Sequence, residues 1–325
     1  MNLFSSGVGY GTGDGQLNDP RGEAVDSSGN VYVADSYNDR FQKFTSDGTF
    51  VRKWGSYGDG DGQFWEVPGI AVDSSGNMYV VDMWNDRIQK FDSFGTFVTK
   101  WGSDGTGDGQ FNFPQGVAVD SSGNVYVADS DNNRIQKFTS DGTFVTKWGS
   151  SGTSGDGEFN YPHGITVDSS GYVYVVDRSN QRIQKFTSDG TYVSQWGSWG
   201  SENGQFWHPY GIAVDSSDNV YVTDAWNNRV QKFTSDGIFI TKWGSEGNGD
   251  GQFNHPMGIT VDDSGNVYVA DTENDRIQKF RPASTGSQQL IRSNSKSSNN
   301  NFNINKLSIQ KRLKEKQKQT KKKDK

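Results

Sequence analysis

The amino-acid sequence predicts an all-β protein, a six-bladed β-propeller of four-stranded antiparallel blades with a disordered basic C-terminal tail. Three observations predict this fold. The phrase VDSSGN or a near variant occurs six times, each copy contains four short strand-like runs, and the last copy lacks the fourth run. We therefore expect a propeller over residues 1–280 and a tail over residues 281–325.

The repeat has a nearly constant length. Successive copies of its first aspartate are separated by 47, 47, 48, 47 and 47 residues. A period of 20–50 residues is typical of units that bury their apolar faces only by packing on their neighbours. The six aspartates are Asp26, Asp73, Asp120, Asp168, Asp215 and Asp262.

Four runs in each copy have strand character, as the third copy shows. Residues 117–119 and 125–128 are rich in β-branched side chains, whereas residues 134–138 and 144–148 alternate between apolar and polar side chains. Both patterns indicate strands, and no helical periodicity interrupts them.

Turn signals separate the strands. Residues 120–124, DSSGN, favour an Asx-type turn, and Ser140-Asp141-Gly142 favours a hairpin loop closed by glycine. Short connections of this kind join neighbouring antiparallel strands, so each copy is expected to form one four-stranded sheet.

The two ends of the repeat region predict how the ring closes. The sixth copy ends after its third strand, at residue 280, and residues 2–8 precede the first copy without a unit of their own. We expect residues 2–8 to supply the missing fourth strand, which would remove an exposed sheet edge.

The repeat resembles a known family. The run DSDNNRIQ at residues 129–136, together with PQGVAVD at residues 114–120, is similar to the NHL repeat, and the resemblance extends over about residues 1–280. It implies a propeller. Similar propellers serve as peptide-amidating lyases, RNA readers, protein-interaction modules and sensor domains, so the resemblance leaves the function open.

Composition narrows the function classes. The chain has no cysteine, which excludes disulfides, thiolate metal sites and the cysteine-rich RING of ubiquitin-ligase relatives. No apolar run is long enough to span a membrane, and no signal peptide is visible. The compartment stays open, with the cytoplasm preferred.

Charge divides the chain into an acidic body and a basic tail. Residues 281–325 contain 13 Lys/Arg and 2 Asp/Glu, and the rest contains 19 Lys/Arg and 37 Asp/Glu. A body with a net charge of −18 disfavours RNA binding, because phosphate contacts need a basic surface. The tail predicts an anionic partner such as nucleic acid; alternatively it is solvated, or it folds back on the acidic body.

Two repeated features are expected to be structural. An aspartate that ends each second strand precedes an arginine by five residues, which predicts one ion pair in every blade, and the Trp-Gly-Ser tryptophans are expected to pack between blades. The pairs are Asp35–Arg40, Asp82–Arg87, Asp129–Arg134, Asp177–Arg182, Asp224–Arg229 and Asp271–Arg276, and the tryptophans are Trp54, Trp101, Trp148, Trp196 and Trp243.

The copies differ mainly in the loop before strand one and in the loop between strands two and three. Antiparallel topology places both loops on one face, so we expect that face to bind a protein, peptide or glycan as a monomeric, non-enzymatic scaffold. The alternative is that its aromatic rings pack locally. The candidate residues are Arg21, Tyr37, Trp65, Trp84, Gln115, Asp131, His163, Arg178, Trp207, Tyr210, Trp226 and Met257.

The same positions allow two enzymatic alternatives. The resemblance to amidating lyases implies zinc-binding histidines after the repeat proline, but only His163 occupies that position, whereas His208 and His255 precede their prolines. Catalytic zinc needs three protein ligands. A calcium-dependent lactonase of the paraoxonase type would need several channel acids. Glu23 is the only acid in the apolar positions of the first strands, and we expect it to pair with Arg21. The sequence therefore predicts no metal and no cofactor.

Overall fold

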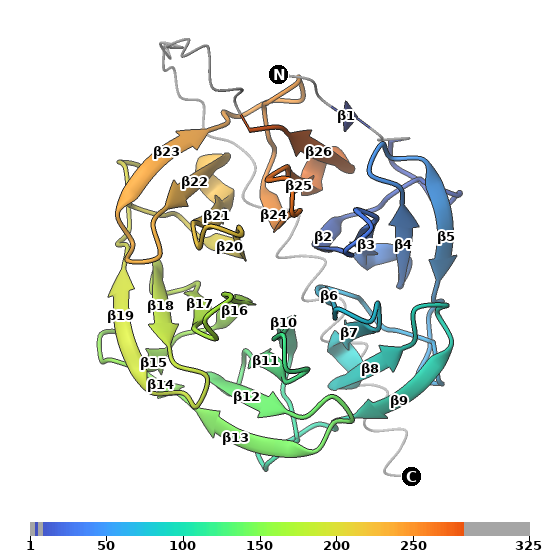
Figure 1. Cartoon of the computed structure of the whole chain (residues 1–325), viewed down its shortest axis with the longest axis horizontal. Coiled ribbons are helices and arrows are strands. Elements are labelled where there is room, and N and C mark those ends of the chain that lie inside the picture. The colour runs from blue at the N-terminus through green and yellow to red at the C-terminus, as the bar shows by residue number, and fades with distance from the viewer. Residues whose placement is uncertain (1–3, 6–8, 283–325) are drawn as a thin grey trace. The chain divides into compact units, whose positions relative to one another are not determined.

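In a computed structural model, residues 9–282 and the short strand at residues 4–5 are described. Six four-stranded antiparallel sheets are arranged in a ring around a central axis (Figure 1). This confirms the six-bladed propeller. The predicted tail and its possible anionic partner lie outside the described residues.

The first three blades follow the chain from the innermost to the outermost strand. Blade one contains β2 (Pro20–Val25), β3 (Val31–Asp35), β4 (Arg40–Phe44) and β5 (Phe50–Trp54). Blade two contains β6 (Ile70–Val72), β7 (Met78–Asp82), β8 (Arg87–Phe91) and β9 (Phe97–Trp101). Blade three contains β10 (Pro114–Val119), β11 (Val125–Asp129), β12 (Arg134–Phe138) and β13 (Phe144–Trp148).

Blades four and five repeat this order. Blade four contains β16 (Pro162–Val167), β17 (Val173–Asp177), β18 (Arg182–Phe186) and β19 (Tyr192–Trp196). Blade five contains β20 (Pro209–Val214), β21 (Val220–Asp224), β22 (Arg229–Phe233) and β23 (Phe239–Trp243). The loop before blade four also holds the parallel pair β14 (Ser150–Ser151) and β15 (Glu158–Phe159).

Blade six is built from both ends of the chain. It contains β24 (Pro256–Val261), β25 (Val267–Asp271) and β26 (Arg276–Phe280), and β1 (Phe4–Ser5) pairs with β26 as the fourth strand. Four 3-10 turns join strands two and three: η1 (Ser36–Asn38), η2 (Met83–Asn85), η3 (Ala225–Asn227) and η4 (Thr272–Asn274).

The apolar core lies between neighbouring blades rather than within one. Between blades one and two, for example, Phe41 packs against Phe64 and Phe91, with the ring centroids 6.0 and 5.5 Å apart. Trp101 of β9 likewise reaches Phe138 of the next blade at 5.8 Å. Each sheet therefore buries its two faces against its neighbours, as expected for a repeat unit that cannot form a core alone.

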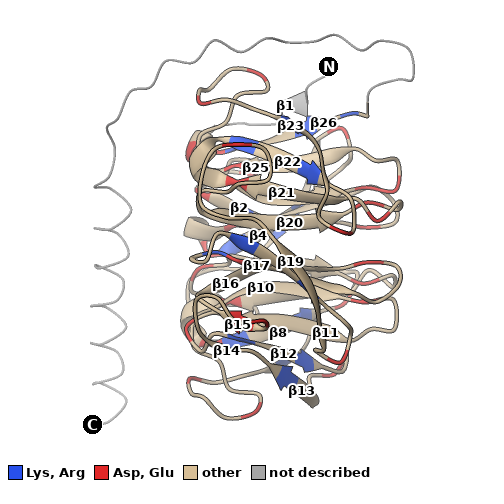
Figure 2. Cartoon of the chain, turned by 90° about the vertical axis from the view of Figure 1, so that its left-hand side faces the viewer, with Lys and Arg blue, Asp and Glu red and all other residues tan. Residues whose placement is uncertain are grey.

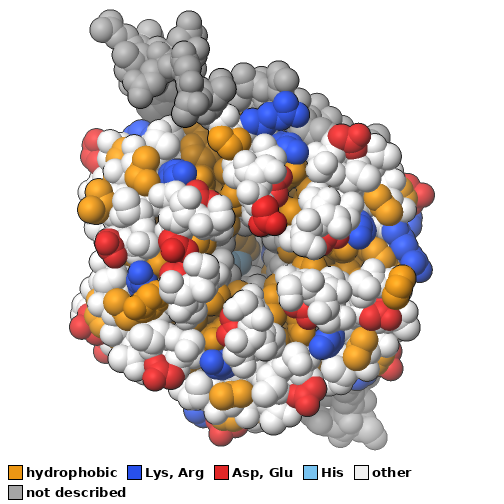
Figure 3. All heavy atoms as spheres, viewed as in Figure 1, with side chains coloured by type: hydrophobic (Ala, Val, Ile, Leu, Met, Phe, Trp, Pro, Cys, Tyr) orange, Lys and Arg blue, Asp and Glu red, His pale blue; other side chains and the backbone are white. Residues whose placement is uncertain are grey.

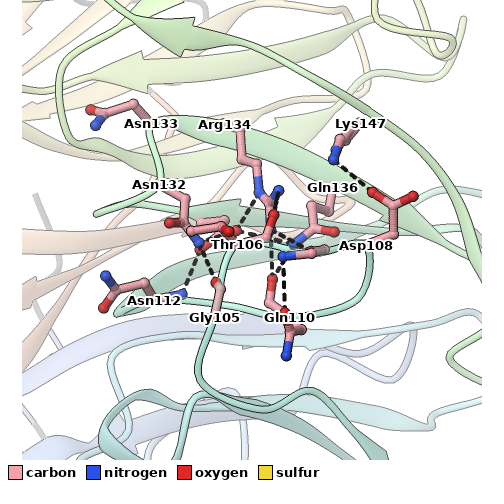
Figure 4. Close-up of polar contacts among 12 residues, drawn as sticks. Gly105, Thr106, Asp108, Gln110, Asn112, Asn132, Asn133, Arg134, Gln136 and Lys147 are labelled. Atoms are coloured by element: carbon pink, nitrogen blue, oxygen red, sulfur yellow. Dashed lines mark hydrogen bonds and ion pairs between the residues drawn. The ribbon is translucent and has the colours of Figure 1, made fainter.

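A polar network holds the loop that precedes each blade, which we call the leading loop (Figure 4). In blade three, the Nε of Arg134 donates to Asp129 at 2.6 Å, and its Nη atoms donate to the backbone carbonyls of Thr106, Gly107 and Gln110. The ion pair is present in all six blades, so the predicted pairs are confirmed. They fix the leading loop as well as strands two and three.

The loops lie at the two ends of the strands (Figure 2). The leading loop and the strand two–three loop share one face, because their backbones hydrogen-bond within each blade, as from the amide of Asp131 to the carbonyl of Asn112. We call this the variable face. The DSSGN and TSDG turns meet on the opposite face, the turn face, where Lys137 also donates to the carbonyl of Ser188 in the next blade.

Candidate binding face and central channel

The residue before the first-strand glycine faces the central channel in every blade. These six channel-slot residues line a cavity of about 70 Å³, and the ring is visibly hollowed at its centre (Figure 3). Sites for drug-sized ligands are roughly 300–1,000 Å³, so this cavity accommodates only a very small group. The channel-slot residues are Arg21, Pro68, Gln115, His163, Tyr210 and Met257.

Arg21 has two acidic partners. Its guanidinium contacts Asp19 and Glu66, each at 2.7 Å, and lies 5.3 Å from the centre of the Tyr37 ring. Burial raises the pKa of Asp19 to about 6 despite the opposing charge of Arg21. Sequence reasoning did not single out Asp19 or Glu66.

The expected pair between Arg21 and Glu23 is wrong. The pairing of β2 with β3 shifts register between Pro20 and Glu23, and this bulge breaks the simple alternation that had put Arg21 and Glu23 on one side of the strand. Neither carboxyl oxygen of Glu23 makes a hydrogen bond within the described part of the chain.

The aromatic residues of blade two form a local core. Trp65 and Trp84 are only 6% and 3% exposed, stack at 5.7 Å and pack with Met83 and Phe113. The Nε1 of Trp84 donates to Glu66 at 2.8 Å. The expectation that these two tryptophans present a binding surface is therefore wrong, since their rings are already covered.

His163 is buried in the channel beside Tyr210, with the two ring centres 3.6 Å apart. Burial, then the charges of Arg178 and Arg21, lower the pKa of His163 well below its ordinary value. The imidazole is therefore neutral at pH 7. The neighbouring Gln115 is also buried and contacts the sulfur of Met83 at 3.0 Å.

Arg178 differs from the other arginines of this face. It forms no ion pair within residues 9–282, and its Nε lacks a hydrogen-bond partner there. Its guanidinium instead lies over the rings of Tyr161 and Tyr210, at 5.8 and 5.4 Å. The two rings hold the charge at the channel mouth by cation–π attraction.

Blade five brings aromatic rings together on the variable face. Trp207 is 37% exposed, and its ring centre lies 5.4 Å from that of the half-buried Trp226. His208 and His255 approach the Trp226 ring at 4.6 and 5.9 Å. Sequence comparison of the blades predicted the two tryptophans here, and they do lie together.

The remaining candidates are spread over the same face. Asp131 is exposed on the loop after β11, Tyr37 is half-buried beneath Arg21, and Met257 is half-buried at the channel. The candidate set thus contains a channel group, a covered pair in blade two and an aromatic group on blade five, with Tyr37, Asp131 and Arg178 outside these groups.

Comparison with known proteins identifies the repeat. The NHL repeat profile matches residues 17–44, 111–138, 159–186, 206–233 and 253–280. The chain belongs to the NHL-repeat family. The second copy of this NHL propeller, residues 64–91, lies outside the matched stretches. There Val67 takes the place of the repeat proline and Pro68 fills the channel slot, and β6 begins only at Ile70.

Several solved structures share the fold of this NHL propeller. A virginiamycin B lyase from Staphylococcus aureus is 17% identical, with 86% of this chain and 98% of that chain covered and a TM-score of 0.58. A protein of unknown function from Bacteroides thetaiotaomicron is 18% identical (86% and 75%; TM-score 0.68). A gluconolactonase from Xanthomonas campestris is 14% identical (85% and 88%; TM-score 0.61). The curated proteins contain no match. Such low identities show the fold alone.

The NHL propeller does not gather its histidines. His163 faces the channel, whereas His208 and His255 contact Trp226 on the variable face. Across the described residues, no group of three or more His, Asp or Glu side chains is placed to hold a metal ion. No membrane-spanning helix occurs in the described part of the chain either.

One variable position of the NHL propeller was not predicted from the sequence. The residue before the repeat proline, or before Val67 in blade two, has a left-handed backbone with φ between 49° and 64°. Its amide donates to an Asp, Asn or Gln side chain of the preceding blade, at 2.6–3.0 Å. The residue type at this position differs among the six copies, and this difference could have identified the position from the sequence. These residues are Asp19, Glu66, Phe113, Tyr161, His208 and His255.

Proposed function

We propose that this NHL propeller is a non-enzymatic binding module that takes an acidic protein or peptide segment on its variable face. The observation that carries the proposal is the contrast between the two faces. The same scaffold contacts recur in every blade, whereas the side chains at the loop positions of one face differ from blade to blade.

The apolar part of the proposed contact is the tryptophan pair of blade five. Trp207 is the more exposed ring, and Trp226 supports it from the neighbouring loop. Partly exposed tryptophans are enriched among residues that dominate binding energy, where truncation costs about 2 kcal/mol or more. A partner that covers Trp207 would gain from removing its apolar surface from water.

The polar part of the proposed contact is Arg178. Arg178 has no carboxylate partner within the described residues. Its Nε is buried, so the donors that a partner could reach are on the two Nη atoms, and a carboxylate can accept from both of them side by side. Arg21 is already occupied by two acids. One unpaired positive charge suits a monovalent carboxylate better than a phosphate dianion. It also suits an acidic peptide better than a neutral glycan.

The size of the channel cavity argues against a lyase or lactonase that encloses a large substrate. A space of about 70 Å³ cannot hold such a molecule. The lyase and gluconolactonase structures share the fold at 17% and 14% identity, which carries no activity to this chain. A partner lying across the face needs no such cavity.

Peptide selection tests this proposal. Peptides selected from a random display library on the immobilised protein would be measured by fluorescence anisotropy against variants. Trp207→Ala/Trp226→Ala should weaken binding at least tenfold, as should Arg178→Gln. Phe94→Ala is the matched control, because Phe94 is a 77% exposed aromatic residue on the turn face.

The outcomes are distinct. Selected peptides rich in Asp or Glu, with binding lost in the first two variants and kept in the control, would support the proposal. Equal binding by the double tryptophan variant, or loss of binding in Phe94→Ala, would overturn it.

A further inference from the structure

The innermost strands carry one acid among apolar channel positions. Five blades place isoleucine or valine at the position after the first-strand glycine, and blade one places Glu23 there. Glu23 is only 7% exposed, and neither of its carboxyl oxygens is hydrogen-bonded within the described residues. The five apolar equivalents are Ile70, Val117, Ile165, Ile212 and Ile259.

This carboxyl group is not required by the fold. Leaving a buried polar group unsatisfied costs about 1–3 kcal/mol, and the five sister blades have an apolar side chain at the equivalent position. Burial raises the pKa of Glu23 well above its ordinary value. Without a cation beside it, Glu23 is therefore favoured in its neutral form.

A separate, acidic cavity lies on the turn face. This cavity of about 160 Å³ lies between blades six, one and two and is lined by Asp26, Asp73, Asp262 and Asp263. Asp26 and Asp73 cap their own turns, but Asp263 replaces the serine of other copies and is exposed. Residue 25 borders this cavity and is two positions along β2 from Glu23, a distance of about 6.8 Å.

We infer that the channel binds a primary ammonium group on an unbranched alkyl stem, with the ammonium on Glu23 and the stem against the surrounding isoleucines. The ligand would enter past the aspartates of the turn face, which attract a cation. The stem of a lysine side chain, or of a small alkylamine, matches the distance from the acidic cavity to Glu23.

Other cations fit this site less well. Calcium takes 6–8 oxygen ligands, whereas Glu23 is the only acid among the side chains around the 70 Å³ cavity. A guanidinium has five donors in a planar fork, of which one carboxylate satisfies two. An ammonium has three donors, and the isoleucine and valine side chains that line the cavity together with Arg21, Gln115 and His163 favour its hydrocarbon stem.

The test uses n-butylammonium chloride as the probe and tetramethylammonium chloride at equal ionic strength as the control. Calorimetric titration of the full chain should show saturable binding of butylammonium, and no binding of the bulky control cation. Glu23→Gln and Glu23→Ile should each weaken butylammonium binding at least tenfold. Both variants should stay folded, because four of the five sister blades have isoleucine at this position and glutamine has nearly the same shape as glutamate.

A second arm separates the two sources of the amine. A peptide with one central lysine is titrated beside butylammonium. Binding of both would assign the site to the lysine of a partner, and binding of butylammonium alone would assign it to free amines. Binding of neither, or equal binding by wild type and Glu23→Ile, would overturn the inference. The peptide surface is tested at Trp207, Trp226 and Arg178, none of which lines the cavity around Glu23, so either proposal can fail without the other.

Discussion

Removing Arg134 should destabilise blade three far more than removing an exposed charge nearby. Arg134 donates to Asp129 at 2.6 Å and to three backbone carbonyls of the leading loop at 2.6–2.8 Å. Asp129 is fully buried. Arg134→Ala leaves this carboxylate without its ionic partner and the three carbonyls without their donor.

The expected loss in the free energy of unfolding follows from these buried contacts of Arg134. Breaking a buried ion pair from one side costs about 3–5 kcal/mol, which is a large part of a typical unfolding free energy of about 5–15 kcal/mol. For a domain of this size the unfolding midpoint should fall by on the order of 10 °C. Lys147→Ala is the control, because its pair with Asp108 is 43% and 56% exposed and such pairs contribute less than about 1 kcal/mol.

Urea unfolding followed by circular dichroism measures the effect. The double variant Asp129→Asn/Arg134→Ala should cost clearly less than the two single changes added together, since the asparagine removes the unpaired charge. An Arg134→Ala variant within about 1 kcal/mol of wild type, or strict additivity in the double variant, would refute the reasoning.

Three further outcomes are expected. Gly142→Ala should lower the free energy of unfolding by about 2–4 kcal/mol, because a Cβ there would lie 2.7 Å from the Trp101 ring and φ is +89°. Gly171→Ala is the control, since its φ of +85° is similar but the space around it is open, and it should cost about 1 kcal/mol. Urea unfolding of both variants measures the difference. The free energy of unfolding should fall as the pH drops below about 6.5, because the unfolded chain binds a proton at His163 and the folded chain, in which the pKa of His163 is lowered, does not. His163→Gln should reduce this fall between pH 7.5 and pH 5. The same pH profile in wild type and variant would contradict the prediction. Deleting residues 1–8 removes the strand that pairs with β26 and should lower the melting temperature and promote self-association through the open edge, which light scattering would detect.

Much of the architecture could be predicted from repetition alone. Asp129 and Arg134 lie five residues apart in a pattern found six times, so their pairing followed from local sequence and the pleat of two adjacent strands. The same holds for Trp101, which packs against the next blade as Trp148, Trp196 and Trp243 do. The blade-five tryptophans were found because the copies differ there. The residue before the repeat proline differs too, but its importance depends on a left-handed backbone that only the structure reveals.

The sequence by itself determined the number of blades, the positions of the strands and the repeated ion pairs, because each depends on spacing that recurs within one unit. The tertiary structure decided the partners of the side chains that differ. Glu66 reaches back across a blade boundary to Arg21, Trp84 is covered by its neighbours, and Arg178 and Glu23 stay without ionic partners within the described residues. Contacts such as the one between Glu66 and Arg21 join different blades of a closed ring. Which side chains meet there depends on how the sheets pack and not on their separation along the chain.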